Sequence, residues 1–312
     1  MSALRYTTMT GEGLLSLAGQ DAGIFLANLL TCDVSTLAIN HGTYGAHCTP
    51  KGRMLANFLL WRSEQSFFMQ LPSSLLDPIQ KQLTKFILRS KVKATDASGD
   101  WTMIGVAGKD SAALVQRVIG QAPQRVREVA HTSDAMVIRL PGDRFEIAVA
   151  KEKAPQILDG LATGAEKTDP EFWEWLDIRA GIATITPATQ EAFVPQMVNL
   201  DLIGGVSFEK GCYPGQEIVA RMHYRGTLKQ RMYLANIAGT EKPQPGDKLY
   251  SPHFGEQTCG TIVNAARAPD AGFDALAVIQ IASAVKGNVR HKTPGGAALN
   301  LLPLPYAVPA SE

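Results

Sequence analysis

The sequence Leu15-Ser16-Leu17-Ala18-Gly19-Gln20-Asp21-Ala22 returns in related form 89 residues later, as Ile104-Gly105-Val106-Ala107-Gly108-Lys109-Asp110-Ser111. In both copies an apolar run ends at a glycine, and apolar residues at helical spacing follow the aspartate. Each copy therefore predicts a strand, a turn and a helix. The repeat indicates two intertwined α+β halves with antiparallel sheets.

In each copy the sequence then predicts a hairpin turn followed by a further helix. The turns are Pro50-Lys51-Gly52 and Pro141-Gly142-Asp143, with apolar strand residues beyond them. The helices are expected at residues 75–88 and 154–161. This order supports the same α+β architecture in both halves.

After the second half, the sequence predicts a helix, then a long loop, and then a β-rich C-terminal region. Asp169 and Pro170 predict the start of a helix over 169–179, because Asp caps helices and Pro suits the first turn. Residues 184–205 lack periodicity and predict a long ordered loop. After Leu228 come short β-like runs that predict a small all-β barrel or sandwich, at 231–237, 258–264, 275–281 and 297–302. We therefore expect two domains, 1–228 and 229–312.

Composition limits the classes of function. The chain has 312 residues, and 30 basic against 29 acidic side chains give a net charge of +1. That balance cannot build the broad positive field of a nucleic-acid-binding protein, so we expect no direct nucleic-acid partner. No run reaches the roughly 18–20 apolar residues of a membrane span, and residues 1–10 do not resemble a secretory signal. We expect a cytoplasmic protein without a membrane partner, and a monomer.

The four cysteines, Cys32, Cys48, Cys212 and Cys259, include no C-x-x-C pair. This spacing argues against a disulfide framework and against a self-sufficient metal site, so no permanently bound metal is predicted. Cys212 differs from the others because it is flanked by Lys, Gly, Tyr, Pro and Gly rather than by aliphatic residues. The other three lie in or beside apolar elements and are expected to be structural.

Cys212 precedes Tyr213-Pro214-Gly215, which suits a tight turn, and a short helix is expected over 216–223. A cysteine near the positive end of a helix, with Lys210, Arg221 or Arg225 close by, has a lowered thiol pKa. The alternative is an ordinary buried cysteine, and the residues alone leave both interpretations open. His223 is expected to be a surface or packing residue, since no further ligand stands at metal spacing from it.

A resemblance starts from the eight residues Lys210-Gly211-Cys212-Tyr213-Pro214-Gly215-Gln216-Glu217. They match the Lys-Gly-Cys-Tyr-x-Gly-Gln-Glu signature of the YgfZ-type folate-binding proteins, a branch of the superfamily of the glycine-cleavage T-protein (aminomethyltransferase). The similarity continues along nearly the whole chain, in segments that include 33–35, 48–53, 177–181, 193–200, 204–208, 217–226 and 303–306.

The resemblance implies a folate-binding domain of three intertwined parts around a central channel, followed by a C-terminal β-barrel. It implies a protein that binds tetrahydrofolate or a derivative and assists [4Fe-4S] cluster assembly or repair, supporting enzymes that modify tRNA. Cys212 is then the functional thiol, with transient contact to iron or a cluster, and the expected partners are iron–sulfur assembly proteins or client enzymes. No classical turnover is implied; if the protein is an enzyme, it is a folate-dependent one-carbon transferase.

Folate needs an aromatic or apolar slot and a few amide or charged groups. Trp173 is the first choice for the slot because its register matches an aromatic position of the family. Gln190, Gln196 and Asn199 are expected at the pterin edge, and Arg221 and Arg225 at the glutamate tail. The alternatives are a core tryptophan and solvated arginines, which the sequence leaves open.

The main competing function is aminomethyl transfer. T-proteins carry an acidic pair in the hairpin where this chain has Ala56-Asn57, and no Asp or Glu occurs from Lys51 to Arg62. A neutral amide cannot stabilise a developing iminium-like cation, which argues against transfer of the glycine-derived carbon. Another one-carbon reaction and a non-folate scaffold remain as further alternatives.

Overall fold

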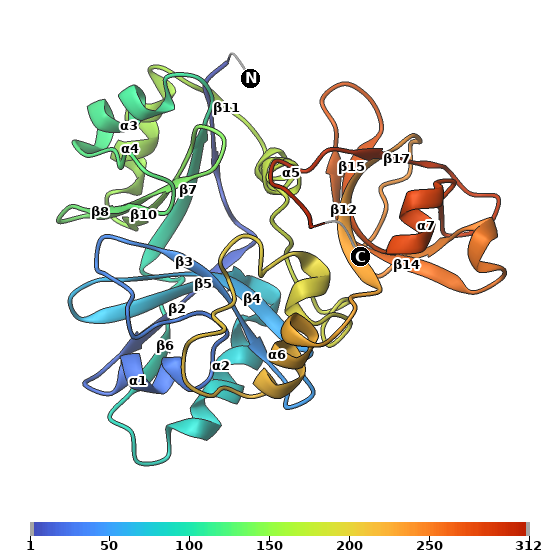
Figure 1. The fold of residues 1–312 in the computed structure, drawn as a ribbon. Coiled ribbons are helices and arrows are strands. Elements are labelled where there is room, and N and C mark those ends of the chain that lie inside the picture. Colours follow the sequence, from blue (N-terminus) through green and yellow to red (C-terminus); the bar gives the residue numbers. More distant parts are fainter. Residues whose placement is uncertain (1–2, 310–312) are drawn as a thin grey trace. The chain divides into compact units, whose positions relative to one another are not determined.

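The computed structural model describes residues 3–309, a mixed α+β chain with three sheets in that range (Figure 1). The chain forms two compact units. The first contains the chain up to Ala27, Asp33–Tyr44 and Phe58–Trp173, and the second contains Asn28–Cys32, Gly45–Asn57 and the chain from Glu174 onward. The division into domains 1–228 and 229–312 stays a prediction, and its outermost residues, 1–2 and 310–312, lie outside the described chain.

A six-stranded sheet has the order β11-β1-β7-β10-β9-β8. Its strands are β1 (Arg5–Thr8), β7 (Trp101–Ala107), β8 (Val129–His131), β9 (Ala135–Leu140), β10 (Arg144–Ala150) and β11 (Glu166–Lys167). All pairs are antiparallel except β1 with β11. Helices α3 (Ser111–Ile119) and α4 (Ala154–Ala162) pack against it, and Phe145 and Ile147 are fully buried in the resulting core.

A five-stranded sheet has the order β3-β4-β5-β2-β6. Its strands are β2 (Glu12–Ala18), β3 (Thr43–Cys48), β4 (Met54–Arg62), β5 (Ser66–Pro72) and β6 (Lys93–Asp96). Helix α2 (Ser73–Ile87) packs on β2, β5 and β6. Its four buried residues, Leu75, Leu76, Ile79 and Leu83, follow helical spacing, so the apolar face predicted from the sequence is the buried one.

Both copies of the repeated sequence form a strand, a turn and a helix. Strand β2 leads into α1 (Ala22–Ala27) as β7 leads into α3. The glycine between them has the same backbone conformation in both copies, with φ of +127° at Gly19 and +122° at Gly108. At each position a Cβ would collide with a backbone carbonyl, 2.1 Å from that of Lys91 and 2.5 Å from that of Ala3. Glycine is required there by both torsion and space.

Both predicted hairpin turns are confirmed. Residues 49–53 reverse the chain between β3 and β4, with the Gly52 N–H donating to the Thr49 carbonyl at 2.9 Å. Between β9 and β10, Leu140 pairs with Arg144 across a three-residue loop, in which Gly142 and Asp143 have φ of +79° and +54°. Glycine and, among other residues, aspartate adopt this left-handed conformation most readily. The helix α5 (Pro170–Arg179) begins as predicted, because Asp169 Oδ1 accepts from the Phe172 N–H at 3.1 Å.

The loop over 184–205 is held by backbone hydrogen bonds. The Phe193 carbonyl accepts from the Met54 N–H at 2.9 Å, and the Glu191 N–H donates to the Met54 carbonyl at 2.8 Å. The loop contains one turn of 3₁₀ helix, η1 (Pro195–Val198), which ends at Asn199 with a φ of +58°. Helix α6 (Gln216–Tyr224) then forms one residue longer than predicted.

The third sheet has the order β16-β13-β14-β15-β12-β17, and its strands are coloured orange to red in Figure 1. Its strands are β12 (Gln230–Ile237), β13 (Lys248–Tyr250), β14 (Thr258–Arg267), β15 (Phe273–Gln280), β16 (Arg290–His291) and β17 (Leu299–Leu302). The two edges are joined, because the His291 N–H donates to the Ala297 carbonyl and the Leu299 N–H to the Val289 carbonyl, both at 2.9 Å.

Four of these strands are the predicted β-runs with shifted ends. The sequence missed β13, β16 and two short helices, η2 (Pro252–Phe254) and α7 (Ile281–Lys286). Among residues 3–309, no helix has both the length and the apolar composition needed to cross a membrane.

Candidate functional site

The predicted turn at the cysteine motif is present. The Gln216 N–H donates to the Tyr213 carbonyl at 3.1 Å, and Gly215 has a φ of +84°. Proline at the first central position and a positive φ at the second are the requirements of a type II turn. Helix α6 begins at Gln216, immediately after the turn. The turn therefore places Cys212 just before the N-terminus of this helix.

The motif lies directly on the hairpin turn of residues 49–52. A Cβ on Gly215 would be 2.5 Å from the Thr49 carbonyl oxygen and 2.6 Å from Gly52 N and Cα. Gly52 itself has a φ of +71°, and its Cβ would be 3.2 Å from Ile218 Cβ. Two segments quoted for their family resemblance, far apart in sequence, therefore meet through two glycines.

Cys212 is exposed, whereas Cys32, Cys48 and Cys259 are buried, as the sequence predicted for those three. Burial raises the pKa of Cys48 to about 12 and also raises the pKa of Cys259 above its ordinary value. These two thiols therefore stay protonated at neutral pH. Cys212 is the cysteine within reach of another molecule.

Lys210 and Tyr213 anchor the segment on both sides of Cys212. The Lys210 Nζ donates to the Leu30 carbonyl at 2.6 Å and lies 5.0 Å from the centre of the Tyr213 ring. Tyr213 is 6% exposed, and burial, with the nearby Cys48 and Cys32, raises its pKa far above the ordinary value. The Tyr213 hydroxyl has no hydrogen-bond partner within residues 3–309. The Lys210 ammonium group and the buried Tyr213 ring therefore hold the segment in place through contacts within the protein.

The remaining motif residues differ in how tightly they are held. Gln216 Nε2 donates to the Lys210 carbonyl at 3.5 Å, and Glu217 is exposed in the first turn of α6. A Cβ on Gly211 would meet nothing within 4 Å, and its φ is not positive. Space and torsion therefore require glycine at 215 and do not require it at 211.

The amides predicted to bind folate make internal hydrogen bonds. Gln190 Nε2 donates to the Leu55 carbonyl at 2.8 Å, and Gln196 Nε2 to the Val219 carbonyl at 2.7 Å. Asn199 Nδ2 donates to the Met232 carbonyl at 3.0 Å and to the Tyr306 hydroxyl at 3.4 Å. These amides hold the loop in place, and their contact with folate stays a prediction.

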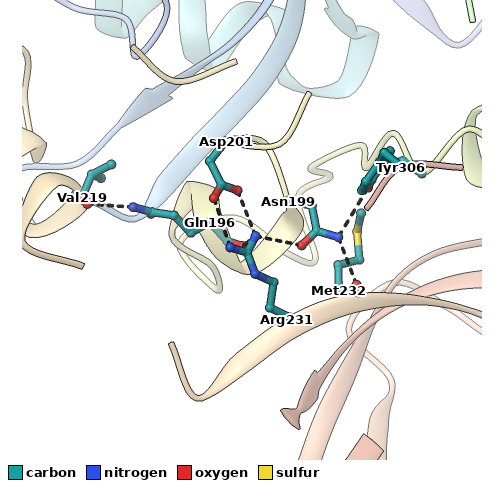
Figure 2. Close-up of polar contacts among 8 residues, drawn as sticks. Gln196, Asn199, Asp201, Val219, Arg231, Met232 and Tyr306 are labelled. Carbon is teal, nitrogen blue, oxygen red and sulfur yellow. Dashed lines mark hydrogen bonds and ion pairs between the residues drawn. The ribbon is translucent and has the colours of Figure 1, made fainter. Parts of the chain in front are cut away.

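Asn199 belongs to a polar network that the sequence did not reveal (Figure 2). Arg231 Nη1 donates to Asn199 Oδ1 at 3.1 Å and to Asp201 Oδ1 at 3.0 Å, while Nη2 donates to Asp201 Oδ2 at 3.1 Å. The two charged side chains are 12% and 9% exposed. A bidentate pair of this kind, shielded from water, fixes the loop against β12.

Tyr306 extends the network to the chain's end. Its hydroxyl donates to the Gly181 carbonyl at 2.8 Å, and a Cβ on Gly181 would lie 2.6 Å from the Tyr306 ring. Gly181 and Tyr306 each lie in a segment that resembles the family. That shared resemblance is the one sequence signal that pointed to this contact.

The other predicted contacts are placed as follows. Trp173 lies in the first unit and is 4% exposed, stacked at 5.2 Å from the Arg144 guanidinium and closely packed on Gly105. Arg221 and Arg225 are exposed in the last turn of α6 and just after it. His223 is exposed, as predicted, and stacks on Phe208 with ring centres 3.8 Å apart.

Asn57, at the position where T-proteins have an acid, is 8% exposed. Its Nδ2 donates to the Ala183 carbonyl at 2.6 Å, and its Oδ1 accepts from the Ile185 N–H at 2.8 Å. An ionised carboxylate could only accept, whereas the amide both donates and accepts, and so Asn57 holds the backbone of 183–185. Within residues 3–309 no group of three or more His, Cys, Asp or Glu side chains is arranged to hold a metal ion.

Comparison with known proteins gives three findings. Residues 6–172 match the model of the GCVT N-terminal domain. The tRNA-modifying protein YgfZ of Yersinia pestis (strain Pestoides F) is 32% identical over 300 residues, 95% of this chain and 90% of that protein. Its namesake from Photobacterium profundum is 35% identical over 241 residues, 76% of this chain and 71% of that protein.

Among solved structures, the glycine cleavage system aminomethyltransferase T from Bartonella henselae superposes with a TM-score of 0.81. The match covers 98% of this chain and 87% of that one at 17% sequence identity. At that identity the likeness concerns the fold alone.

Proposed function

The chain belongs to the GCVT N-terminal domain family and to the family of the proteins named tRNA-modifying protein YgfZ, and on this premise we propose that it binds tetrahydrofolate or a derivative. In the proposed role it assists assembly or repair of [4Fe-4S] clusters in the cytoplasm and so supports iron–sulfur enzymes, including those that modify tRNA. The proposed architecture is a three-part folate-binding domain around a channel, followed by a β-barrel.

The observation that carries the proposal is the exposure of Cys212 on a rigidly seated segment. Lys210 is tied to the Leu30 carbonyl, and Gly215 lies against the backbone of residues 49–52. A single thiolate per chain cannot hold a cluster, since clusters need about four protein ligands. Cys212 therefore acts together with a partner protein or a small thiol, by ligating iron transiently or by attacking a disulfide of that partner, which releases the other sulfur as a thiol.

The residues present fit a folate in part. Gln196 keeps a buried side-chain oxygen, Oε1, without a hydrogen-bond partner within residues 3–309, as an acceptor for a pterin N–H. Arg221 and Arg225 are exposed cations for the carboxylates of the glutamate tail. Asn199, by contrast, uses both its oxygen and its nitrogen within the chain.

Aminomethyl transfer is the less favoured alternative. The catalytic charge of such an enzyme must face the developing cation. Here the corresponding residue is a neutral amide whose two polar atoms are bonded to the backbone of 183–185. Folate is therefore proposed as a bound effector, and the chemistry is left to Cys212.

Calorimetric titration with tetrahydrofolate tests folate binding. We expect saturable binding by the wild type and unchanged affinity for Cys212→Ala. The double variant Arg221→Ala/Arg225→Ala should bind about 10- to 100-fold more weakly, as expected for lost hydrogen bonds to charged groups. Lys286→Ala, at an exposed lysine ending α7, serves as the control for surface charge. Absence of binding up to millimolar tetrahydrofolate would remove folate from the proposal.

A further inference from the structure

The end of α2 and the loop that joins it to β6 carry a local excess of positive charge (Figure 1). Residues 78–95 contain no Asp or Glu, although the whole chain has a net charge of only +1. They contain five basic residues, all of them exposed: Lys81, Lys85, Arg89, Lys91 and Lys93. A cluster of one sign of charge in a nearly neutral protein attracts a partner of the opposite sign.

Most of this charge is not neutralised within the protein. Lys81 Nζ forms an ion pair with Asp77 Oδ2 at 2.8 Å. The other four cations form no ion pair with any residue in the range 3–309: Lys85, Arg89, Lys91 and Lys93. These four charges are therefore available to a partner.

Two large apolar side chains are exposed among the cations. Phe86, in the last turn of α2, is 49% exposed, and Leu88, which follows the helix, is 90% exposed. Leu88 also has a φ of +37°, in the left-handed region that is unfavourable for a side chain of this size. Leu88 therefore has neither burial nor a relaxed backbone within the chain.

The loop that presents Leu88 is held at its far end by the start of α1. The Lys91 N–H donates to Asp21 Oδ2 at 2.7 Å, and the Lys91 carbonyl accepts from the Asp21 N–H at 3.4 Å. Inside the loop, the Ser90 N–H donates to the Ile87 carbonyl at 2.7 Å. Leu88 therefore lies in a hydrogen-bonded turn between two fixed elements.

We propose that Phe86 and Leu88, with the four unpaired cations, form a surface that binds an anionic lipid membrane. The cations contact the lipid phosphates, and the two apolar side chains enter the boundary between headgroups and acyl chains. Interfaces between proteins favour Arg and contain little Lys, whereas three of these four cations are lysines, so an acidic protein is the less favoured partner.

This inference goes beyond the proposed function and depends neither on folate nor on Cys212. The expectation of no membrane partner was based on the lack of a spanning segment, and binding to a membrane surface needs no such segment. The protein would then contact the cytoplasmic side of a membrane reversibly, because the anchoring charges are few and screened by salt.

Co-sedimentation of the full chain with lipid vesicles tests the proposal. We expect binding to vesicles made of equal parts of phosphatidylglycerol and phosphatidylcholine, weaker binding as salt increases, and no binding to phosphatidylcholine alone. Lys85→Gln/Lys93→Gln should bind about tenfold or more weakly, since each cation near an anionic surface contributes about fivefold.

Leu88→Gly tests the apolar contribution. Glycine suits the positive φ, so the fold is not at risk, and urea unfolding verifies this. Binding should weaken about fivefold or more, as expected for partial burial of a leucine. The control for both variants is Val285→Ser/Lys286→Gln, which removes an exposed valine and lysine from α7 and should bind as the wild type does.

Four results would overturn the proposal: no binding to the anionic vesicles, equal binding to neutral ones, wild-type binding by Leu88→Gly, or an equal loss in the control. Poly-L-glutamate serves as the probe for the less favoured partner. If it bound through Lys85 and Lys93 while anionic vesicles did not bind, the surface would take an acidic protein and the membrane assignment would be wrong.

Discussion

At the scale of single residues, the motif separates into a reactive position and positions that hold it. Cys212 is exposed, while Lys210, Tyr213 and Gly215 are committed to contacts with segments 28–32 and 45–57. Lys210, Tyr213 and Gly215 of the eight-residue signature therefore hold the segment that carries the exposed Cys212. The resemblance drew attention to all eight residues equally, and the contacts distinguish among them.

Gly215→Ala tests this distinction. We expect a loss of roughly 2 kcal/mol or more in unfolding free energy, since a left-handed alanine costs about 1–2 kcal/mol and its Cβ meets backbone atoms at residues 49 and 52. Gly211→Ala, with open space and no positive φ, should stay within about 0.5 kcal/mol of the wild type. Urea unfolding of both variants measures the difference. Equal unfolding free energies for the two variants would contradict the close contact of Gly215 with residues 49 and 52.

Tyr306 makes a pH-dependent contribution to the stability of the folded chain. Burial raises the pKa of Tyr306 to about 12, and the folded state therefore favours the neutral phenol. Its stabilising effect is complete below the unfolded pKa of about 10 and is lost as pH rises from there towards 12. Tyr306→Phe should cost about 1 kcal/mol near neutral pH and show a smaller loss between pH 10 and 12. Parallel stability curves for the two proteins would contradict this role.

At the scale of elements, the network around Arg231 joins three parts of the second unit. It connects the loop carrying Gln196 and Asn199 with β12, and Gln196 continues it to α6 through the Val219 carbonyl (Figure 2). The helix that follows the cysteine is thus fixed to the C-terminal sheet by hydrogen bonds rather than by apolar packing alone. Its single fully buried side chain, Val219, agrees with this.

Arg231→Ala tests the network. Removing the guanidinium leaves Asp201, 9% exposed, and Asn199 Oδ1 without their donor, so we expect a loss of about 3–5 kcal/mol in unfolding free energy. The control is Lys81→Ala, which breaks the exposed Lys81–Asp77 pair in α2 and should cost less than about 0.5 kcal/mol. If thermal and urea unfolding gave both variants the same free energy of unfolding, the Arg231–Asp201 pair would not contribute to the stability of the fold.

At the scale of the whole molecule, the sequence predicted whatever depends on local pattern. The repeat, both hairpin turns, the Asp169 cap and the Tyr213-Pro214-Gly215 turn follow from residues next to one another. The Arg231 network and the contact of Gly215 with residues 49–52 join segments that no periodicity relates. Strands β13 and β16, of three and two residues, are too short to show alternation.

The candidate site divides in the same way. Exposure of Cys212 was inferable from its polar and turn-forming neighbours. The internal hydrogen bonds of Gln190, Gln196 and Asn199 were not, because an amide in a loop has the same appearance whether it binds a ligand or a distant carbonyl. The expected role in iron–sulfur cluster assembly or repair came from the family resemblance alone, because no local sequence pattern indicates it.

The most direct measurement is complementation of a bacterium that lacks its own YgfZ-type protein, scoring tRNA methylthiolation and a [4Fe-4S] dehydratase activity. Wild type and Gly211→Ala should restore both activities, while Cys212→Ala, folded and still binding tetrahydrofolate, should restore neither. Full rescue by Cys212→Ala would contradict the assignment of its thiol, and no rescue by soluble wild-type protein would contradict the iron–sulfur role itself.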